Sequence, residues 1–250
     1  MLRRFFVEAS IEPDRPCVIT GSEARHMVKV LRMAPGDRLM LMDGGGARFE
    51  AVIQSATRRE VTVRPEKPLP SLPPSPVEII LCQALLKSDP MDYLIQKTSE
   101  LGVDAIFPFF SQRTIVRLEE ERFAHRLRHW NEVGRSAAKQ SGRIAPPLIA
   151  APSGLEALTA KWRTESGLKA ILWEGEGKRD LKALLRDSSR TDRFIGIIGP
   201  EGGFAREEVI TAEEAGFISV SLGSRILRAE TAAMAMVAVV QYEWGDLAFQ

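Results

Sequence analysis

The sequence is poor in the residues that usually build a disulfide framework or a metal centre. Its 250 residues include 2 cysteines, Cys17 and Cys82, and 3 histidines. Neither cysteine has a near neighbour of its own kind, so we expect free thiols in a reducing cytoplasm and a cytoplasmic location. His125 and His129 have the i, i+4 spacing that can bind zinc. Because no cysteine lies nearby and His26 is the only other histidine, we expect no metal.

Long hydrophobic runs are also missing. The longest apolar stretch, from Ala232 to Val240, is roughly half of what a membrane span requires. The first residues are basic but lack the apolar core of a signal peptide. We therefore expect no membrane partner. The formal net charge is only +1, so a nucleic-acid surface would have to come from local clusters of lysine and arginine.

Prolines mark the one clear boundary in the chain. Six of the 15 prolines fall between Pro65 and Pro76, and proline both fixes φ and lacks an N–H group, so we expect no regular element there. This run predicts a first domain over 1–70, a linker over 71–76 and a second domain over 77–250. The hydrophobic fraction of 44% is sufficient for a core in each.

The two predicted domains have different secondary-structure patterns. In the first, apolar runs with partial alternation predict strands, and Ser22 is placed to cap one helix over 22–32; together they suggest a small β-barrel. In the second, apolar strands alternate with helices, which is typical of a mostly parallel sheet covered on both faces. The expected strands are 4–7, 37–43, 49–53 and 60–63, then 77–81, 104–110, 170–173, 194–198 and 217–222; the expected helices of the second domain are 90–101, 119–140, 180–186, 205–215 and 230–244.

Three glycine-bearing segments follow strands of the second domain. They are Trp173-Glu-Gly-Glu176, Ile198-Gly-Pro-Glu-Gly-Gly-Phe204 and Leu222-Gly-Ser-Arg-Ile-Leu-Arg-Ala-Glu-Thr-Ala232. Ligands of parallel α/β sheets bind beyond the carboxyl ends of strands, so these loops could converge on one pocket. The chain lacks both the G-x-G-x-x-G and the G-x-x-x-x-G-K-[ST] nucleotide motifs. Each loop taken alone could be a plain turn, but the combination indicates a binding site.

The second and third loops closely resemble those of the ribosomal RNA small subunit methyltransferase E family. The resemblance extends over the whole chain, since Arg4-Phe-Phe6, His26-Met-Val-Lys-Val-Leu-Arg32 and Gln140-Ser-Gly-Arg143 also fit the family, as do Lys87 and the segment 96–103. Lys139 is a departure, because the family pattern has an acidic residue before the glutamine.

The resemblance implies an α/β enzyme in two parts. An N-terminal PUA-like β-barrel would help to hold RNA, and a C-terminal SPOUT methyltransferase domain would contain a deep trefoil knot, a feature that periodicity could not suggest. It implies a homodimer that uses S-adenosylmethionine to methylate N3 of one uridine in 16S ribosomal RNA. Whether free RNA or the assembled 30S subunit is the substrate stays open.

The expected site residues follow from the chemistry of this reaction. N3 of uracil carries a proton, so the enzyme must stabilise a developing uridinate or supply a base. Arginine suits the first role, and Arg228 is our choice, with Arg4 and Arg143 as other candidates; Glu201 and Glu230 are possible bases. Alternatively, Glu230 caps the last helix and pairs with Arg228. The expected cofactor-binding residues are Leu172, Glu174, Gly199, Glu201, Gly202, Leu222, Gly223, Ile226, Leu227 and Thr231.

A basic stretch is the expected RNA surface. Arginines and lysines recur from Arg113 to Arg143, Arg117 and Arg122 among them, although interspersed glutamates are equally compatible with a solvated helix face. The expected RNA-binding residues are Arg4, His26, Arg32, Lys87, Arg113, Arg135 and Arg143. An RNA-binding assembly factor without activity, and a SPOUT enzyme that acts on transfer RNA or another base, remain the alternatives.

Overall fold

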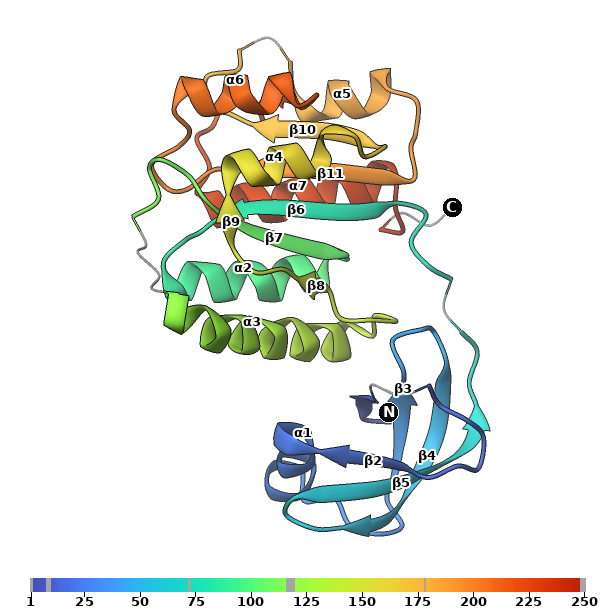
Figure 1. Ribbon diagram of the computed structural model, residues 1–250. Coiled ribbons are helices and arrows are strands. Elements are labelled where there is room, and N and C mark those ends of the chain that lie inside the picture. Colours follow the sequence, from blue (N-terminus) through green and yellow to red (C-terminus); the bar gives the residue numbers. More distant parts are fainter. Residues whose placement is uncertain (1, 8–9, 72, 116–119, 178, 248–250) are drawn as a thin grey trace. The chain divides into compact units, whose positions relative to one another are not determined.

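The chain forms two compact units in a computed structural model (Figure 1). The structure describes residues 2–7, 10–71, 73–115, 120–177 and 179–247. The first unit comprises Met1–Pro74 together with Ala138–Pro146, and the second comprises Ser75–Ala137 and Pro147–Gln250. The return of 138–146 to the first unit is a feature that the proline pattern does not indicate. Whether the two units are separate folding domains stays a prediction.

A five-stranded sheet dominates the described part of the first unit, with strand order β1-β3-β4-β5-β2. β1 pairs parallel with β3 and the other neighbours are antiparallel. Alternate residues such as Leu39, Leu41 and Ile53 point into one buried core. The strands are β1 (Arg4–Phe6), β2 (Cys17–Thr20), β3 (Arg38–Met42), β4 (Arg48–Ala56) and β5 (Glu60–Pro68). β2 was not predicted, although its Val-Ile-Thr sequence is typical of a strand.

The expectation that the proline run forms no regular element from Pro65 onward is wrong. β5 continues to Pro68, and Pro65 and Pro68 pair with residues of β4. β2 pairs only with residues 60–63 of β5, so the later residues of β5 have a ladder neighbour on one side alone. The register of β4 against β5 also shifts between Glu50 and Ala51. A one-sided, bulged stretch tolerates residues that lack an N–H donor.

The single helix expected over 22–32 is in fact two short elements. α1 (Gly21–Arg25) leads directly into a π-helix, η1 (His26–Val30), where the Leu31 N–H donates to the carbonyl oxygen of His26 at 3.0 Å. The expected cap at Ser22 is also wrong, since Thr20 occupies the N-cap position and makes no side-chain hydrogen bond. Arg32 ends the segment with a φ of 52°, outside the range of right-handed helices.

A parallel sheet forms the middle of the second unit, in the order β12-β10-β11-β6-β7-β8 among the described residues, with β9 also paired to β7. Sequence reasoning placed the five longer strands within two or three residues and missed the two shortest. The strands are β6 (Glu78–Ala84), β7 (Ala105–Phe110), β8 (Leu148–Ile149), β9 (Ser153–Gly154), β10 (Leu168–Leu172), β11 (Arg193–Ile198) and β12 (Ile218–Val220).

Helices cover both faces of this sheet (Figure 1). Successive residues of β6 alternate between two cores: Ile79 and Leu81 pack against one set of helices, Ile80 and Cys82 against the other. The first core includes α2 (Ser88–Glu100), α3 (Glu120–Ser141), α5 (Leu181–Asp187) and α7 (Ala229–Glu243); the second includes α4 (Leu155–Arg163) and α6 (Arg206–Glu214). No helix in the described ranges is both long enough and apolar enough to span a membrane.

Candidate active site

Three neighbouring strands bring the glycine-bearing segments together. β12, β10 and β11 lie side by side and run in the same direction, so their carboxyl ends share one edge of the sheet. The loops that follow them, with the start of α7, enclose a cavity of about 550 Å³. Cavities that bury small organic ligands have volumes of about 300–1,000 Å³. This pocket lies where ligands of parallel α/β sheets bind.

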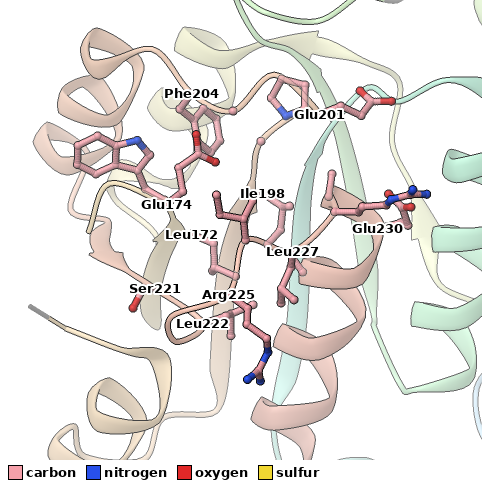
Figure 2. A pocket seen from close by; sticks show the side chains of 18 of the residues that line it. Leu172, Glu174, Ile198, Glu201, Phe204, Ser221, Leu222, Arg225, Leu227 and Glu230 are labelled. Atoms are coloured by element: carbon pink, nitrogen blue, oxygen red, sulfur yellow. The ribbon is translucent and has the colours of Figure 1, made fainter. Parts of the chain in front are cut away.

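The pocket has an apolar centre and a charged rim. Figure 2 shows Leu172, Ile198 and Leu227 grouped in the middle, with Glu174 beside Phe204 on one side and Glu230 on the other. Leu172 ends β10 and Ile198 ends β11, so the sheet itself fixes two walls. Such a surface suits a flat apolar group, while the backbone of the loops offers hydrogen bonds around it.

Charged side chains of both signs line the pocket. Three are carboxylates and three are cations: Glu174, Glu201, Glu230, Lys87, Arg225 and Arg228. Arg228 is the N-cap residue of α7 but makes no side-chain cap, and Glu230 lies in the first turn. Across the described residues neither side chain makes an ion pair or hydrogen bond. The alternative in which Glu230 caps α7 and pairs with Arg228 is therefore not observed, and both groups are available to a ligand.

Two glycines explain why these loops need residues without a side chain. Gly203 has a φ of +69°, and a Cβ there would lie 2.5 Å from Oε1 of Glu174. Gly223 has a φ of +91°, and a Cβ there would meet nothing within 4 Å. At both positions the left-handed conformation favours glycine; at Gly203 a side chain would also displace the carboxylate end of Glu174. The space at Gly223 is open to a ligand.

The structure gathers most of the predicted cofactor-binding residues around this cavity. Those along its lining are Leu172, Glu174, Gly199, Glu201, Leu222, Gly223, Ile226 and Leu227. Gly202 and Thr231 lie outside the lining: the Gly202 carbonyl oxygen instead accepts a hydrogen bond from Arg113, and Thr231 is exposed on α7. The binding role of each residue stays a prediction.

Several lining residues were not singled out from the sequence. Trp173 and Phe204 belong to the predicted loops, and Ser221 belongs to the predicted strand 217–222, so their segments were found but not their roles. Pro90 lines the pocket from α2, and no local pattern indicates that contact. A sequence reveals which loops share an edge of a sheet more readily than which neighbouring helix faces them.

Arg4 and the segment before Arg143 come together within the first unit. The Arg4 guanidinium donates to the backbone carbonyl oxygens of Lys139 and Gln140, each at 3.1 Å. Lys139 in turn forms an ion pair with Glu23, with Nζ and Oε1 2.6 Å apart and both side chains 18% exposed. Lys139 departs from the family pattern, and in this chain its charge has a specific partner.

The other predicted RNA-binding residues are dispersed. His26 is exposed, Arg32 follows η1, and Lys87 lines the pocket. Arg113 Nη1 donates to the Gly202 carbonyl oxygen at 3.0 Å. Arg135 and Arg143 are half-buried in the two units. Arg117 lies outside the described residues, as does the side chain of Arg122.

The two histidines of α3 do not act together in this structure. Nε2 of His129 lies 2.8 Å from Oδ2 of Asp92 on α2, whereas His125 is exposed. Among the residues whose placement is described, no three histidine, cysteine or carboxylate side chains gather as metal ligands. The thiol of Cys82, in β6, is fully buried, and this burial raises its pKa far above the usual range.

Known proteins share both units of this chain. The family profile of the RNA methyltransferase domain matches residues 73–241, and that of the RNA methyltransferase PUA domain matches residues 19–66. The ribosomal RNA small subunit methyltransferase E of Bacillus subtilis is 26% identical over 97% of each chain. That of Synechocystis is 30% identical over 86% of this chain and 69% of its own.

Two solved structures have nearly the same fold. A methyltransferase of Legionella pneumophila, in complex with its cofactor S-adenosylmethionine, is 32% identical, with a TM-score of 0.91 over 99% of this chain and 100% of that one. The ribosomal RNA small subunit methyltransferase E of Neisseria gonorrhoeae, also bound to S-adenosylmethionine, is 33% identical, with a TM-score of 0.89 over the same shares.

Fold, pocket and profiles together define an RNA methyltransferase with an N-terminal PUA domain. This confirms the expected α/β class and its PUA-like and methyltransferase parts. Since the matching profile covers most of the chain and the relatives extend over both units, the chain belongs to the ribosomal RNA small subunit methyltransferase E family.

Proposed function

We propose that this protein transfers a methyl group from S-adenosylmethionine to N3 of a uridine in 16S ribosomal RNA. The observation that carries the proposal is that both segments resembling the family line one shared cavity at the carboxyl ends of β10, β11 and β12. Relatives named for the small-subunit ribosomal RNA support the choice of substrate.

The residues of the cavity suit S-adenosylmethionine. Leu172, Ile198 and Leu227 offer apolar surface for an adenine ring, and backbone groups of the loops offer hydrogen bonds to it. The carboxylates of the rim can attract the positive charges of the sulfonium and the amino group. The open space beside Gly223 admits a ligand close to the backbone. We assign Gly199, Glu201, Gly202, Leu222, Ile226 and Thr231 to this cofactor as well.

When bound, S-adenosylmethionine supplies a methyl group on a sulfonium, which is reactive without a metal. The chain must hold the uridine in line and remove its N3 proton. Arg228 has a permanent charge and no partner within the described residues, so it can stabilise the oxygens of a developing uridinate. Glu201 or Glu230, which line the same cavity, would accept the proton.

We assign RNA binding to Arg4, His26, Arg32, Lys87, Arg113, Arg135 and Arg143. Lys87 supports the assignment because it is exposed at the pocket. Arg4 supports it less directly: its guanidinium orders the backbone at 139–140, just before Arg143. Positively charged side chains bind RNA mainly through attraction to its phosphates. The affinity for RNA should therefore fall as the salt concentration rises.

We further propose a homodimer that forms through α7. Residues of α7 at helical spacing, among them Ala235, Ala238 and Tyr242, remain partly or fully exposed in the single chain, and Tyr93 of the adjacent α2 is 48% exposed. An apolar strip of this kind suits a symmetric partner that presents the same surface.

We also propose that the segment from Leu222 through α7 is threaded into a trefoil knot. Two features support this. α7 follows β12 at the edge of the sheet yet packs on β6 and β11 near its middle (Figure 1). Ser221 also pairs with Asp180, after β10, just before the chain turns back. A crystallographic chain trace without a crossing there would contradict the proposal.

The proposed reaction takes place in the cytoplasm, where ribosomal subunits assemble, and the two free thiols of Cys17 and Cys82 are compatible with a reducing compartment.

Analysis of 16S ribosomal RNA by mass spectrometry, from cells that lack the gene, tests the function. One 3-methyluridine should be missing, and the wild-type gene should restore it while Arg228→Met should not. An intact 3-methyluridine in the deletion strain would contradict the proposal.

A further inference from the structure

Glu208 is a buried carboxylate that the proposed reaction does not use. It is the third residue of α6 and is only 4% exposed. Its Oε2 accepts a hydrogen bond from the Ala205 N–H at 2.9 Å and one from Ser111 Oγ at 3.2 Å. Its Oε1 accepts from the Gln112 N–H at 2.9 Å. One carboxylate thus joins the start of α6 to a segment almost a hundred residues earlier in the chain.

The segment at the other end of these bonds is a tight turn after β7. The Ser111 N–H donates to Oγ1 of Thr114, and the Thr114 N–H donates to the Ser111 carbonyl oxygen, at 2.9 and 3.0 Å. Arg113 in this turn provides a second connection, through its hydrogen bond to the Gly202 carbonyl oxygen. The turn Ser111–Thr114 is therefore attached to the loop Gly199–Ala205 at two points.

That loop is one wall of the pocket. Phe204, which lines the cavity, stacks on Phe109 of β7 with ring centroids 6.4 Å apart. The same ring lies so close to Gly199 that a Cβ there would be 3.0 Å from it. The shape of the wall thus depends on where Phe204 and Ala205 are held, and the Ala205 N–H is held by Glu208.

A buried carboxylate is costly unless donors surround it. In the described part of the chain Glu208 has no cationic partner, so N–H and O–H donors alone offset the cost of its burial. The N–H groups of Gln112 and Ala205 donate to different oxygens of the carboxylate, and the Ser111 hydroxyl donates to the same oxygen as Ala205. A glutamine of the same shape would have to place its NH₂ group against a donor. Charge and acceptor capacity, and not only size, are therefore needed at this position.

We propose that Glu208 is a positioning residue for the cofactor pocket. Its carboxylate fixes the loop Gly199–Ala205 against the turn Ser111–Thr114 and so keeps that wall in the form that binds S-adenosylmethionine. The role rests on the proposed cofactor, but it concerns the loop and not the methyl acceptor. It predicts that loss of one acceptor oxygen weakens cofactor binding without loss of the fold.

Calorimetry of S-adenosylmethionine binding, with no RNA present, tests this role. The variants are Glu208→Gln and the matched control Glu207→Gln, whose exposed side chain precedes it on the same helix. We expect Glu208→Gln to weaken binding about tenfold and Glu207→Gln to leave it unchanged within about twofold, a difference of ~1.4 kcal/mol. Hydrogen exchange should rise at the amides of Gln112 and Ala205 in Glu208→Gln and not in the core strand β6.

A second variant approaches the same contacts from the other side. Ser111→Ala with Arg113→Met removes two connections to the turn but leaves Glu208 in place, and it should also weaken cofactor binding. If Glu208→Gln does not fold, this variant decides the matter. Wild-type affinity in both folded variants, or unchanged exchange at Gln112 and Ala205, would overturn the proposal. Failure of the wild type to bind the cofactor would instead overturn the proposed function, and this role with it.

Discussion

Gly223 and Gly216 have the same left-handed φ but different surroundings. Both have a φ of +91°, and a Cβ at either would meet nothing within 4 Å, yet only Gly223 lines the pocket. Any side chain strains the backbone at both positions, so Gly216 is a matched control for that strain.

Gly223→Leu should therefore weaken S-adenosylmethionine binding, measured by calorimetry, by about tenfold or more. The reason is that the new side chain occupies space the ligand needs. Gly216→Leu should lose a similar amount of thermal stability but bind the cofactor normally. Equal cofactor affinity in the two folded variants would show that the ligand does not approach Gly223.

The two cysteines should differ in reactivity because only the thiolate is nucleophilic. Burial raises the pKa of both thiols, but Cys82 is fully buried in β6 whereas Cys17 is partly accessible. Iodoacetamide should label Cys17 of the native protein, faster as the pH rises toward the thiol pKa, and should label Cys82 only after unfolding. Mass spectrometry of the labelled peptides checks this; rapid labelling of native Cys82 would contradict the burial seen here.

At the residue scale, the sequence indicates the loop residues better than the residues that hold the loops. Glycines after strands are visible in any sequence, and they point to the right pocket. Glu208 was missed because its capping pattern is incomplete: Ala205 occupies the position where serine or threonine would complete the capping box. Its bonds to Ser111 and Gln112 join distant segments and leave no local pattern.

At the element scale, α7 has two faces with different roles. Met236 and Val240 are fully buried within the chain, so a charge there would disrupt the core and would not report on a dimer. Ala235 and Ala238 lie on the partly exposed face. Apolar residues occur on nearly all sides of α7, so the sequence alone does not show which face the sheet covers.

Charge on the two faces should therefore have different effects. Met236→Lys should lower the free energy of unfolding by more than about 3 kcal/mol, since it buries an unpaired charge. Ala235→Glu should leave monomer stability nearly unchanged but shift sedimentation from dimer to monomer. A wild-type protein that sediments as a monomer at micromolar concentration would contradict the proposed interface.

Prediction of the elements succeeded where periodicity was regular over several residues. The five longer strands of the parallel sheet are mostly apolar runs and were found, whereas the two-residue strands β8 and β9 were not. α4 was overlooked although Leu155, Leu158, Thr159 and Trp162 are buried at helical spacing, so the signal was present. The π-helix η1 could not be predicted, since its i to i+5 bonding changes the spacing on which helical patterns depend.

At the scale of the whole molecule, the chain returns to its first unit at 138–146. Ala138 packs against Phe6 and Met42, and Lys139 pairs with Glu23, more than a hundred residues earlier. No sequence pattern predicts such a contact, because it joins segments that are more than a hundred residues apart in the chain. The proline run marks only one of the places where the chain passes between units.

The Lys139–Glu23 pair should be measurable by a double-mutant cycle. Both side chains are mostly buried, so Glu23→Gln and Lys139→Gln should each destabilise the protein, with a coupling energy of about 1–3 kcal/mol. Urea unfolding monitored in the first unit checks this. The reversed pair, Glu23→Lys with Lys139→Glu, should recover part of the loss, and strictly additive effects would show that the ion pair contributes nothing.

Methyl transfer in a purified system is the direct test of the proposed reaction. The protein would be incubated with S-adenosylmethionine labelled in its methyl group and with small ribosomal subunits from cells that lack the gene. Digestion of the 16S ribosomal RNA followed by mass spectrometry then identifies the product. We expect one labelled 3-methyluridine per subunit with the wild type and almost none with Arg228→Met. Label on another base, label on transfer RNA only, or no label in the presence of bound cofactor would contradict it.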